Sequence, residues 1–310
     1  MPYVPVPALT RDKLLETAES RWSRVVNDHP DLTPAVDLQR GLLTIVVDLG
    51  VAVDSGRLPR LSMPPKYLAA KLARGVPIFA GEPIPLPVEL LKTSLARLCD
   101  RLASGGAGEV AAHIRDAVGS GNLEAGSLLT ASLARDQQAI RTGASHRGLA
   151  PDLVWLVAEL AVSPVAFALQ RVLFGNTSND ALRSALGAWT HGYCPACGSW
   201  PALAEVFGGH RVLRCSFCAA GWEPTRYACV YCDESGKRFV TAAPDQERKN
   251  RRLELCSSCA FYLKTVDLDE LSPFPLLAIA DLETMDLDLA AMEHGYRRPP
   301  LKEFTKPPHP

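Results

Sequence analysis

The sequence predicts an α+β protein with several domains: an all-helical N-terminal domain, then two rubredoxin- or zinc-ribbon-like β subdomains that bind metal, and a C-terminal helix. Three observations support this prediction. Apolar residues recur at three- and four-residue steps over roughly the first 180 residues, which is the pattern of amphipathic helices. After Trp189 the pattern changes to short β-like runs separated by turn residues. Eight of the nine cysteines lie in this later part of the chain.

The helical stripes predict a domain over residues 1–190. The first stripe is Leu14, Ala18, Trp22 and Val25, and Thr33-Pro34 has the form of an N-cap followed by a proline in the first turn of the next helix. Further stripes contain Leu68 and Leu72, Val88 to Leu98, Val110 to Val118, Leu129 to Ile140, Leu153 to Phe174, and a short segment from Asn179 to Trp189. Glycine-rich breaks separate several of them, so we expect a bundle of helices joined by tight turns.

The run from Leu153 to Phe174 is the most apolar part of the chain. Because Glu159, Pro164 and Arg171 interrupt it, the sequence predicts a core helix and no membrane span. The N-terminus lacks a basic stretch followed by an apolar one, so we expect no secretory signal and a cytoplasmic protein. In that compartment paired cysteines favour metal binding over disulfides.

The cysteines form four CxxC pairs. Two residues between cysteines allow a tight turn in which both thiolates face one ion, and two such knuckles supply four sulfurs in a tetrahedron. The predicted metal ligands are Cys194, Cys197, Cys215, Cys218, Cys229, Cys232, Cys256 and Cys259. Four thiolates suit both iron (Fe2+ or Fe3+) and zinc, so the prediction is two ions per chain of either metal. The ninth cysteine, Cys99, lies in a helical stripe and is expected to be a small buried apolar residue.

The spacing of the pairs favours local pairing into two sites. The gaps between successive pairs are 17, 10 and 23 residues, and the two longer gaps leave room for a β-hairpin that returns the chain to the metal. Gly208-Gly209 between Leu203–Phe207 and His210–Leu213 has the form of such a hairpin. We therefore predict one metal subdomain over residues 191–226 and a second over residues 227–268. Interleaved or nested pairing of the four CxxC motifs is the alternative.

The last segment, residues 269–310, is predicted to hold one amphipathic helix and a proline-rich tail. Leu282, Met285, Leu289 and Met292 fall on one helical face between residues 281 and 295, and this face is expected to pack back on the helical domain.

Other polar features point away from catalysis and nucleic acid. His191 and His210 flank the first cysteine site, where sulfur already supplies four ligands, and the basic run Arg248–Arg252 is expected to be a solvated hairpin tip. The net charge is −1, which disfavours general nucleic-acid binding. The sequence contains no P-loop, GxGxxG, GxSxG or HExxH motif, so we predict no catalytic residues, no cofactor other than metal and no enzymatic activity.

The cysteine motifs resemble a known family, the FdhE accessory proteins of formate dehydrogenase. The motifs that carry the resemblance are YCPACGSWP from Tyr193, LRCSFC from Leu213, CVYC from Cys229 followed by Glu234-Ser-Gly-Lys, CSSCAFYLK from Cys256, and DLETMDLDLAAMEHGYR from Asp281. The third knuckle departs from a rubredoxin knuckle at Tyr231 and Asp233.

The resemblance implies a cytoplasmic protein that assists the assembly of formate dehydrogenase by binding its catalytic subunit. It also implies iron at the rubredoxin-like knuckles and no activity of the protein's own. Two alternatives remain at this point: a rubredoxin-like electron carrier or thiol-redox protein, and a zinc-ribbon adaptor that binds nucleic acid.

Overall fold

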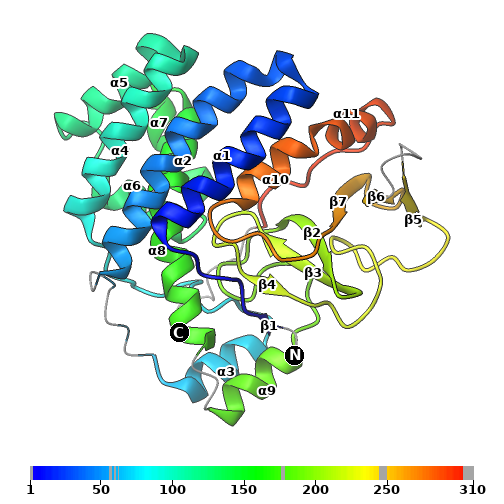
Figure 1. The fold of residues 1–310 in the computed structure, drawn as a ribbon. Coiled ribbons are helices and arrows are strands. Elements are labelled where there is room, and N and C mark those ends of the chain that lie inside the picture. The colour runs from blue at the N-terminus through cyan, green and yellow to red at the C-terminus, as the bar shows by residue number, and fades with distance from the viewer. Residues whose placement is uncertain are drawn as a thin grey trace. The chain divides into compact units, whose positions relative to one another are not determined.

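A computed structural model of the chain describes residues 3–55, 58, 61, 63–175, 179–243 and 250–302 (Figure 1). The chain forms two compact units, one of residues 1–8, 63–80 and 170–310, and the other of residues 9–62 and 81–169. Both units are assembled from separate stretches of sequence, whereas the sequence predicts contiguous domains with boundaries at 190, 226 and 268. The predicted domains with boundaries at 190, 226 and 268 stay a prediction.

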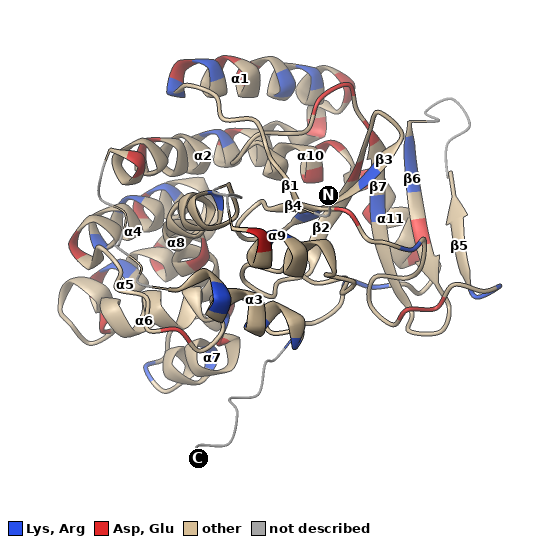
Figure 2. Ribbon diagram, turned by 90° about the horizontal axis from the view of Figure 1, so that it is seen from below, with Lys and Arg blue, Asp and Glu red and all other residues tan. Residues whose placement is uncertain are grey.

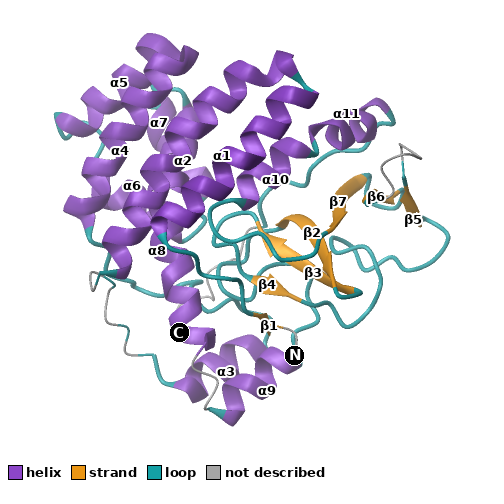
Figure 3. Cartoon of the chain, viewed as in Figure 1, coloured by secondary structure: helices purple, strands orange, loops and turns teal. Residues whose placement is uncertain are grey.

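The unit of residues 9–62 and 81–169 is helical, as predicted (Figure 3). Its helices are α1 (Arg11–Asp28), α2 (Thr33–Asp54), α4 (Val88–Leu102), α5 (Gly108–Gly119), α6 (Ala125–Leu133), α7 (Gln137–Ser145) and most of α8 (Pro151–Gly175), with the short helices η1 (Pro30–Leu32) and η2 (Ala103–Ala107). Helix α1 begins at Thr10, whose side-chain oxygen accepts a hydrogen bond from the Lys13 amide at 3.4 Å. Its predicted apolar stripe is the buried face of the helix.

Cys99 on α4 is fully buried, which confirms it as a core residue of this helical unit. Burial raises the pKa of its thiol to about 12, so it is neutral and unreactive in the folded protein. Acidic and basic side chains are interspersed along α1, in keeping with the near-zero net charge (Figure 2).

Helix α8 is, in the described part of the chain, the one helix whose length and composition would allow it to cross a membrane. However, 72% of its most apolar stretch is buried inside the protein. The helix continues through Pro164. Burial of this extent is typical of the core helix that the sequence predicts.

The other unit is built on one seven-stranded sheet. Its strands, in chain order, are β1 (Tyr3–Val4), β2 (Pro201–Phe207), β3 (His210–Cys215), β4 (Gly221–Trp222), β5 (Phe239–Ala242), β6 (Arg251–Cys256) and β7 (Phe261–Asp267). The predicted hairpin is present, with Phe207 paired to His210 across Gly208-Gly209. Both glycines have positive φ, as a two-residue hairpin turn requires.

The sheet contains two similar halves joined side by side. The strand order is β1-β4-β3-β2-β7-β6-β5, so β2, β3 and β4 stand in the same order as β5, β6 and β7. Strands β2 and β7 pair in parallel through Leu203 to Val206 and Lys264 to Asp267, and all other pairs are antiparallel. The two predicted metal-binding segments therefore share one continuous sheet.

Helices surround the sheet within the same unit. Helices α3 (Pro65–Ala73) and α9 (Asp180–Gly187) pack against each other. The C-terminal segment forms two helices, α10 (Leu277–Glu283) and α11 (Met285–Glu293), where the sequence predicts one. Helix α11 packs against β6 and β7.

The prediction of which face of the C-terminal helix is buried is wrong. Leu289 and Met292 are 56% and 61% exposed, whereas Leu287 and Ala291 pack with Leu253 and Tyr262 of the sheet. Within α11, Leu287 and Ala291 are four residues apart and share the face that packs on the sheet, which leaves Leu289 and Met292 on the other side of the helix.

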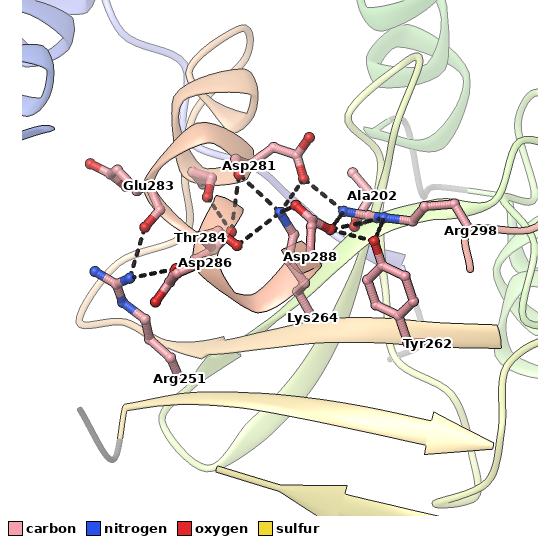
Figure 4. Close-up of polar contacts among 11 residues, drawn as sticks. Ala202, Arg251, Tyr262, Lys264, Asp281, Glu283, Thr284, Asp286, Asp288 and Arg298 are labelled. Atoms are coloured by element: carbon pink, nitrogen blue, oxygen red, sulfur yellow. Dashed lines mark hydrogen bonds and ion pairs between the residues drawn. The ribbon is translucent and has the colours of Figure 1, made fainter. Parts of the chain in front are cut away.

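A cluster of charged side chains also holds these helices to the sheet (Figure 4). The Lys264 ammonium, fully buried, lies 2.6 Å from a carboxylate oxygen of Asp281 and 2.6 Å from one of Asp288. The Arg298 guanidinium contacts the same two carboxylates at 3.0 and 2.8 Å.

Candidate metal centres

The eight paired cysteines come together as two groups of four. One group is Cys194, Cys197, Cys215 and Cys218, and the other is Cys229, Cys232, Cys256 and Cys259. Within each group all four sulfurs lie within 4.8 Å of one another. This is the local pairing that the gap lengths favour, and the interleaved alternative is wrong.

The spacing of the sulfurs fits a four-coordinate metal and excludes disulfides. Sulfur–sulfur distances in the first group are 3.6 Å for Cys194–Cys218 and 3.4 Å for Cys197–Cys215. In the second group they are 3.7 Å for Cys229–Cys259 and 3.6 Å for Cys232–Cys256. A tetrahedron with metal–sulfur bonds of about 2.3 Å has edges of about 3.8 Å, whereas a disulfide bond is about 2 Å long. The four-sulfur sets therefore fit zinc or a single iron ion.

Each knuckle uses the same backbone turn. The residue after its second cysteine has positive φ in all four knuckles: Gly198 (82°), Ala219 (51°), Asp233 (61°) and Ala260 (58°). In three of them the amide of this residue donates to the carbonyl of the first cysteine, at 2.9 Å from Gly198, 2.9 Å from Asp233 and 2.8 Å from Ala260. Of the four, only Gly198 adopts this left-handed conformation without the strain that a β-carbon adds.

Backbone amides point at the sulfurs, as thiolate ligands require. In the second knuckle the amides of Phe217 and Cys218 both donate to the Cys215 sulfur at 3.4 Å. In the fourth knuckle, burial opposes ionisation of Cys256, but hydrogen bonds from the Cys259 and Ser258 amides bring the pKa of its thiol below the usual value.

The first site is enclosed. Cys194, Cys215 and Cys218 are fully buried, and Cys197 is 3% exposed. The loop after α3 covers the first knuckle, because the amides of Ile78 and Phe79 donate to the carbonyls of Pro195 and Ala196 at 3.0 and 2.9 Å. Burial raises the pKa of the Cys194 and Cys218 thiols well above their ordinary value. A bound cation must therefore displace the protons for these sulfurs to be thiolates.

A buried ion pair borders the first site. Arg214 and Glu205, on neighbouring strands, are both fully buried and their charged groups are in direct contact. Arg214 also donates to the Ser272 carbonyl at 2.7 Å, and Glu205 accepts from the Ser272 amide at 3.2 Å. Arg214 directly precedes Cys215, and the carboxylate of Glu205 balances the positive charge of its guanidinium. This pair is not among the residues predicted from the sequence; the signal for it is a charged residue between Leu213 and Cys215 in an apolar strand.

The second site is open on one side. Cys229 and Cys256 are buried, but Cys232 is exposed and Cys259 is partly exposed. Burial raises the pKa of the Cys259 thiol to about 11. At the surface, the Ser258 hydroxyl donates to a carboxylate oxygen of Glu234 at 3.0 Å and links the fourth knuckle to the third.

Two histidines near the first site have other partners. The ring of His191 stacks on Tyr193, with centroids 4.8 Å apart. His210 Nδ1 lies 2.7 Å from a carboxylate oxygen of Glu223. Neither histidine belongs to a cysteine group. The basic run Arg248–Arg252 lies partly outside the described residues; in its described part, Arg251 and Arg252 pair with Asp286 and Asp267.

The two sites are in contact through the knuckles themselves. Trp200 lies between them, with its ring centroid 6.0 Å from that of Tyr193 and 5.2 Å from that of Tyr231. Tyr231 lies inside the third knuckle and also packs edge-on against Phe261 at 5.6 Å. The aromatic residue that departs from a rubredoxin knuckle thus joins the two halves of the unit.

Comparisons with known proteins match part of the sequence and nearly the whole fold. No protein-family profile matches the chain. FdhE homologues are similar: one from Aquifex aeolicus is 34% identical over 140 residues, or 41% of this chain and 46% of the relative. One from Stutzerimonas stutzeri is 34% identical over 121 residues (37% and 39%), and one from Pseudomonas putida is 36% identical over 115 residues (34% and 36%). The matches span less than half the length of these curated relatives.

The fold comparison covers more of the chain. The crystal structure of the FdhE protein from Pseudomonas aeruginosa matches with a TM-score of 0.59 and 25% identity over 96% of both chains. The resemblance to the FdhE family that the cysteine motifs predict is therefore confirmed, by sequence over the matched segment and by fold over nearly the whole chain.

Proposed function

We propose that this protein is an accessory factor for formate dehydrogenase: it binds the catalytic subunit during assembly and has no catalytic activity of its own. The observation that carries the proposal is the pair of four-cysteine sites on an FdhE-like fold. Each cysteine group has the spacing of a metal centre. In this proposal the protein acts in the cytoplasm.

All eight paired cysteines are metal ligands in this proposal, with two ions per chain. The metal is iron or zinc. The sulfur–sulfur distances of 3.4 to 3.7 Å support this ligation. Metal analysis of anaerobically purified protein, together with its absorption spectrum, tests it: two equivalents are expected, with visible thiolate-to-iron absorption for iron and a colourless protein for zinc. Less than one equivalent in freshly purified protein contradicts it.

A matched pair of variants separates metal ligation from general stability. Cys215→Ser removes one ligand of the first site, whereas Cys99→Ala changes a buried cysteine outside both groups. Cys215→Ser is expected to lose one ion, and Cys99→Ala to keep two.

Binding to the catalytic subunit is tested by co-purification. The tagged protein, loaded with metal, is expected to retain a formate dehydrogenase catalytic subunit, and a strain that lacks the protein is expected to lose formate dehydrogenase activity. Restoration of activity by Cys99→Ala but not by Cys215→Ser ties the function to the metal centres. Normal enzyme activity in the deletion strain, together with no retention of the subunit, overturns the proposal.

The rubredoxin-like alternative makes a different prediction. An electron carrier requires a metal that is reduced and oxidised reversibly, so a zinc-loaded protein would be inactive. Restoration of enzyme activity by zinc-loaded protein would therefore favour the assembly role over electron transfer.

A further inference from the structure

We propose that the two cysteine sites have different tasks: the second, formed by Cys229, Cys232, Cys256 and Cys259, exchanges its ion with thiol-bearing ligands, while the first holds its ion permanently. This inference rests on the metal ligation proposed above. It assigns to the second site an activity, metal exchange in the folded protein, with thiols as the class of ligand.

Access to the sulfurs differs between the sites. An incoming ligand can reach a bound ion only where a sulfur ligand faces solvent. Cys232 is exposed and Cys259 is partly exposed, whereas the most exposed cysteine of the first site, Cys197, is 3% exposed. A thiol therefore reaches the second site directly, but reaches the first only after the surrounding structure opens.

The residues that flank the sulfurs explain this difference. In the first site the residue before Cys218 is Phe217, which is 2% exposed. In the second site the corresponding residue, before Cys259, is Ser258, which is exposed to solvent. The first knuckle is also covered by the amides of Ile78 and Phe79. The second site has instead a surface hydrogen bond between Ser258 and Glu234, which can open without disturbing the core.

The two sites also differ in how the charge of a bound ion and its four thiolates is solvated. A divalent ion with four thiolates carries a net charge of −2, which is costly to bury without a partner. At the first site, buried Arg214 stands directly before Cys215, but buried Glu205 balances its charge, so this ion pair adds no net positive charge. The corresponding residue before Cys256 is Leu255. At the second site Cys232 is exposed, so water can solvate the charge of the ion and its thiolates while the ligands change.

The exchange step at the second site is balanced in charge and atoms. The incoming thiol would lose its proton as its sulfur takes the ligand position of Cys232, and the same substitution at the other three cysteines would release the ion. Cys232 accepts that proton and leaves as a neutral thiol, so no oxidant or reductant is needed. Its exposed position makes proton transfer through water possible.

Isotope exchange tests the proposal on the full-length protein. Protein loaded with zinc of natural composition is mixed with excess zinc-67 and glutathione, and the isotope content of the native protein is followed by mass spectrometry. One of the two ions is expected to exchange at least about tenfold faster than the other. In Cys232→Ser the fast phase is expected to disappear, with the slow phase unchanged. Mapping by iodoacetamide should find Cys232 and Cys259 labelled before any cysteine of the first site.

A reciprocal pair of variants checks the cause. Phe217→Ser is expected to speed exchange at the first site, and Ser258→Phe to slow it at the second. If Phe217→Ser does not fold, the Cys232→Ser variant and the order of iodoacetamide labelling still test whether the second site exchanges its ion faster. Equal exchange rates for both ions, or a fast phase that persists in Cys232→Ser, overturn the inference but leave metal ligation intact. A wild-type protein that binds no zinc or iron overturns the proposed ligation itself.

Discussion

Gly192 lies so close to Val230 that a β-carbon at position 192 would come within 1.9 Å of the Val230 carbonyl oxygen. The obstacle is backbone, which cannot rotate away as a side chain would. This contact holds the start of the first knuckle against the third knuckle, and so joins the two halves of the sheet unit.

Gly192→Ala is therefore expected to lower the free energy of unfolding by about 1 to 3 kcal/mol, the usual cost of overpacking. The control is Gly50→Ala in the C-terminal part of α2, where a β-carbon meets nothing within 4 Å. That change is expected to stabilise the protein by about 0.5 to 1 kcal/mol because alanine favours helix. Urea unfolding of both variants measures the difference; equal stabilities would contradict the close approach.

The ion pair between Arg214 and Glu205 gives a second prediction. Arg214→Met leaves the Glu205 carboxylate buried without its partner, so we expect a loss of about 3 to 5 kcal/mol. The double variant Arg214→Met with Glu205→Leu removes both charges and should recover part of that loss. A double-mutant cycle by chemical denaturation measures the coupling. Additive losses would show that the two charges are independent.

The left-handed turns of the knuckles give a third prediction. Ala260 has φ of 58°, so Ala260→Gly relieves backbone strain and is expected to raise stability by up to about 1 kcal/mol. Gly198 occupies the same position in the first knuckle with φ of 82°, and Gly198→Ala is expected to lower stability by about 1 kcal/mol or more. Thermal unfolding of the metal-loaded protein checks both, and shifts in the same direction would contradict the common turn.

The carboxylate of Asp288 gives a prediction for pH. Burial alone would raise its pKa, but the charges of Arg298 and Lys264 and its hydrogen bonds outweigh burial and hold the pKa below the usual value. Because the pKa is lower in the folded state, the stabilisation is complete above the pKa of the unfolded state, about 3.9. It is lost as the pH falls through the lower folded value.

Asp288→Asn should therefore cost about 2 kcal/mol at neutral pH, and the gap to wild type should close below about pH 4. Asp286→Asn on the same helix, at a more exposed carboxylate, is the control and should change stability little. Denaturation curves between pH 3 and 7 measure the gap; a gap that stays constant over this range rules out the proposed role of the charge.

Local patterns were enough to predict the helices and the cysteine groups. The stripe of Leu14, Ala18, Trp22 and Val25 is the buried face of α1 because helical period alone fixes which residues share a face. The two groups of four cysteines follow from gap lengths and from the Gly208-Gly209 hairpin, since pairing within a hairpin is a short-range property.

Long-range packing could not be predicted in this way. The sequence predicts a single C-terminal helix with Leu289 and Met292 inward. The helix is instead broken at Thr284, and in its second part Leu287 contacts the sheet while Leu289 and Met292 are exposed. The parallel pairing of β2 with β7 joins strands about 60 residues apart. No local signal in the chain encodes it.

The sequence by itself determined the proposed ligand set, because CxxC spacing and four soft sulfurs are the pattern of a tetrahedral metal site. Only the tertiary structure decided that the two sites differ. Burial of Cys194 and Cys218 beside Arg214, and exposure of Cys232, depend on which distant segments cover each knuckle. Solvent access is a property of packing, so nearly identical motifs acquire different surroundings.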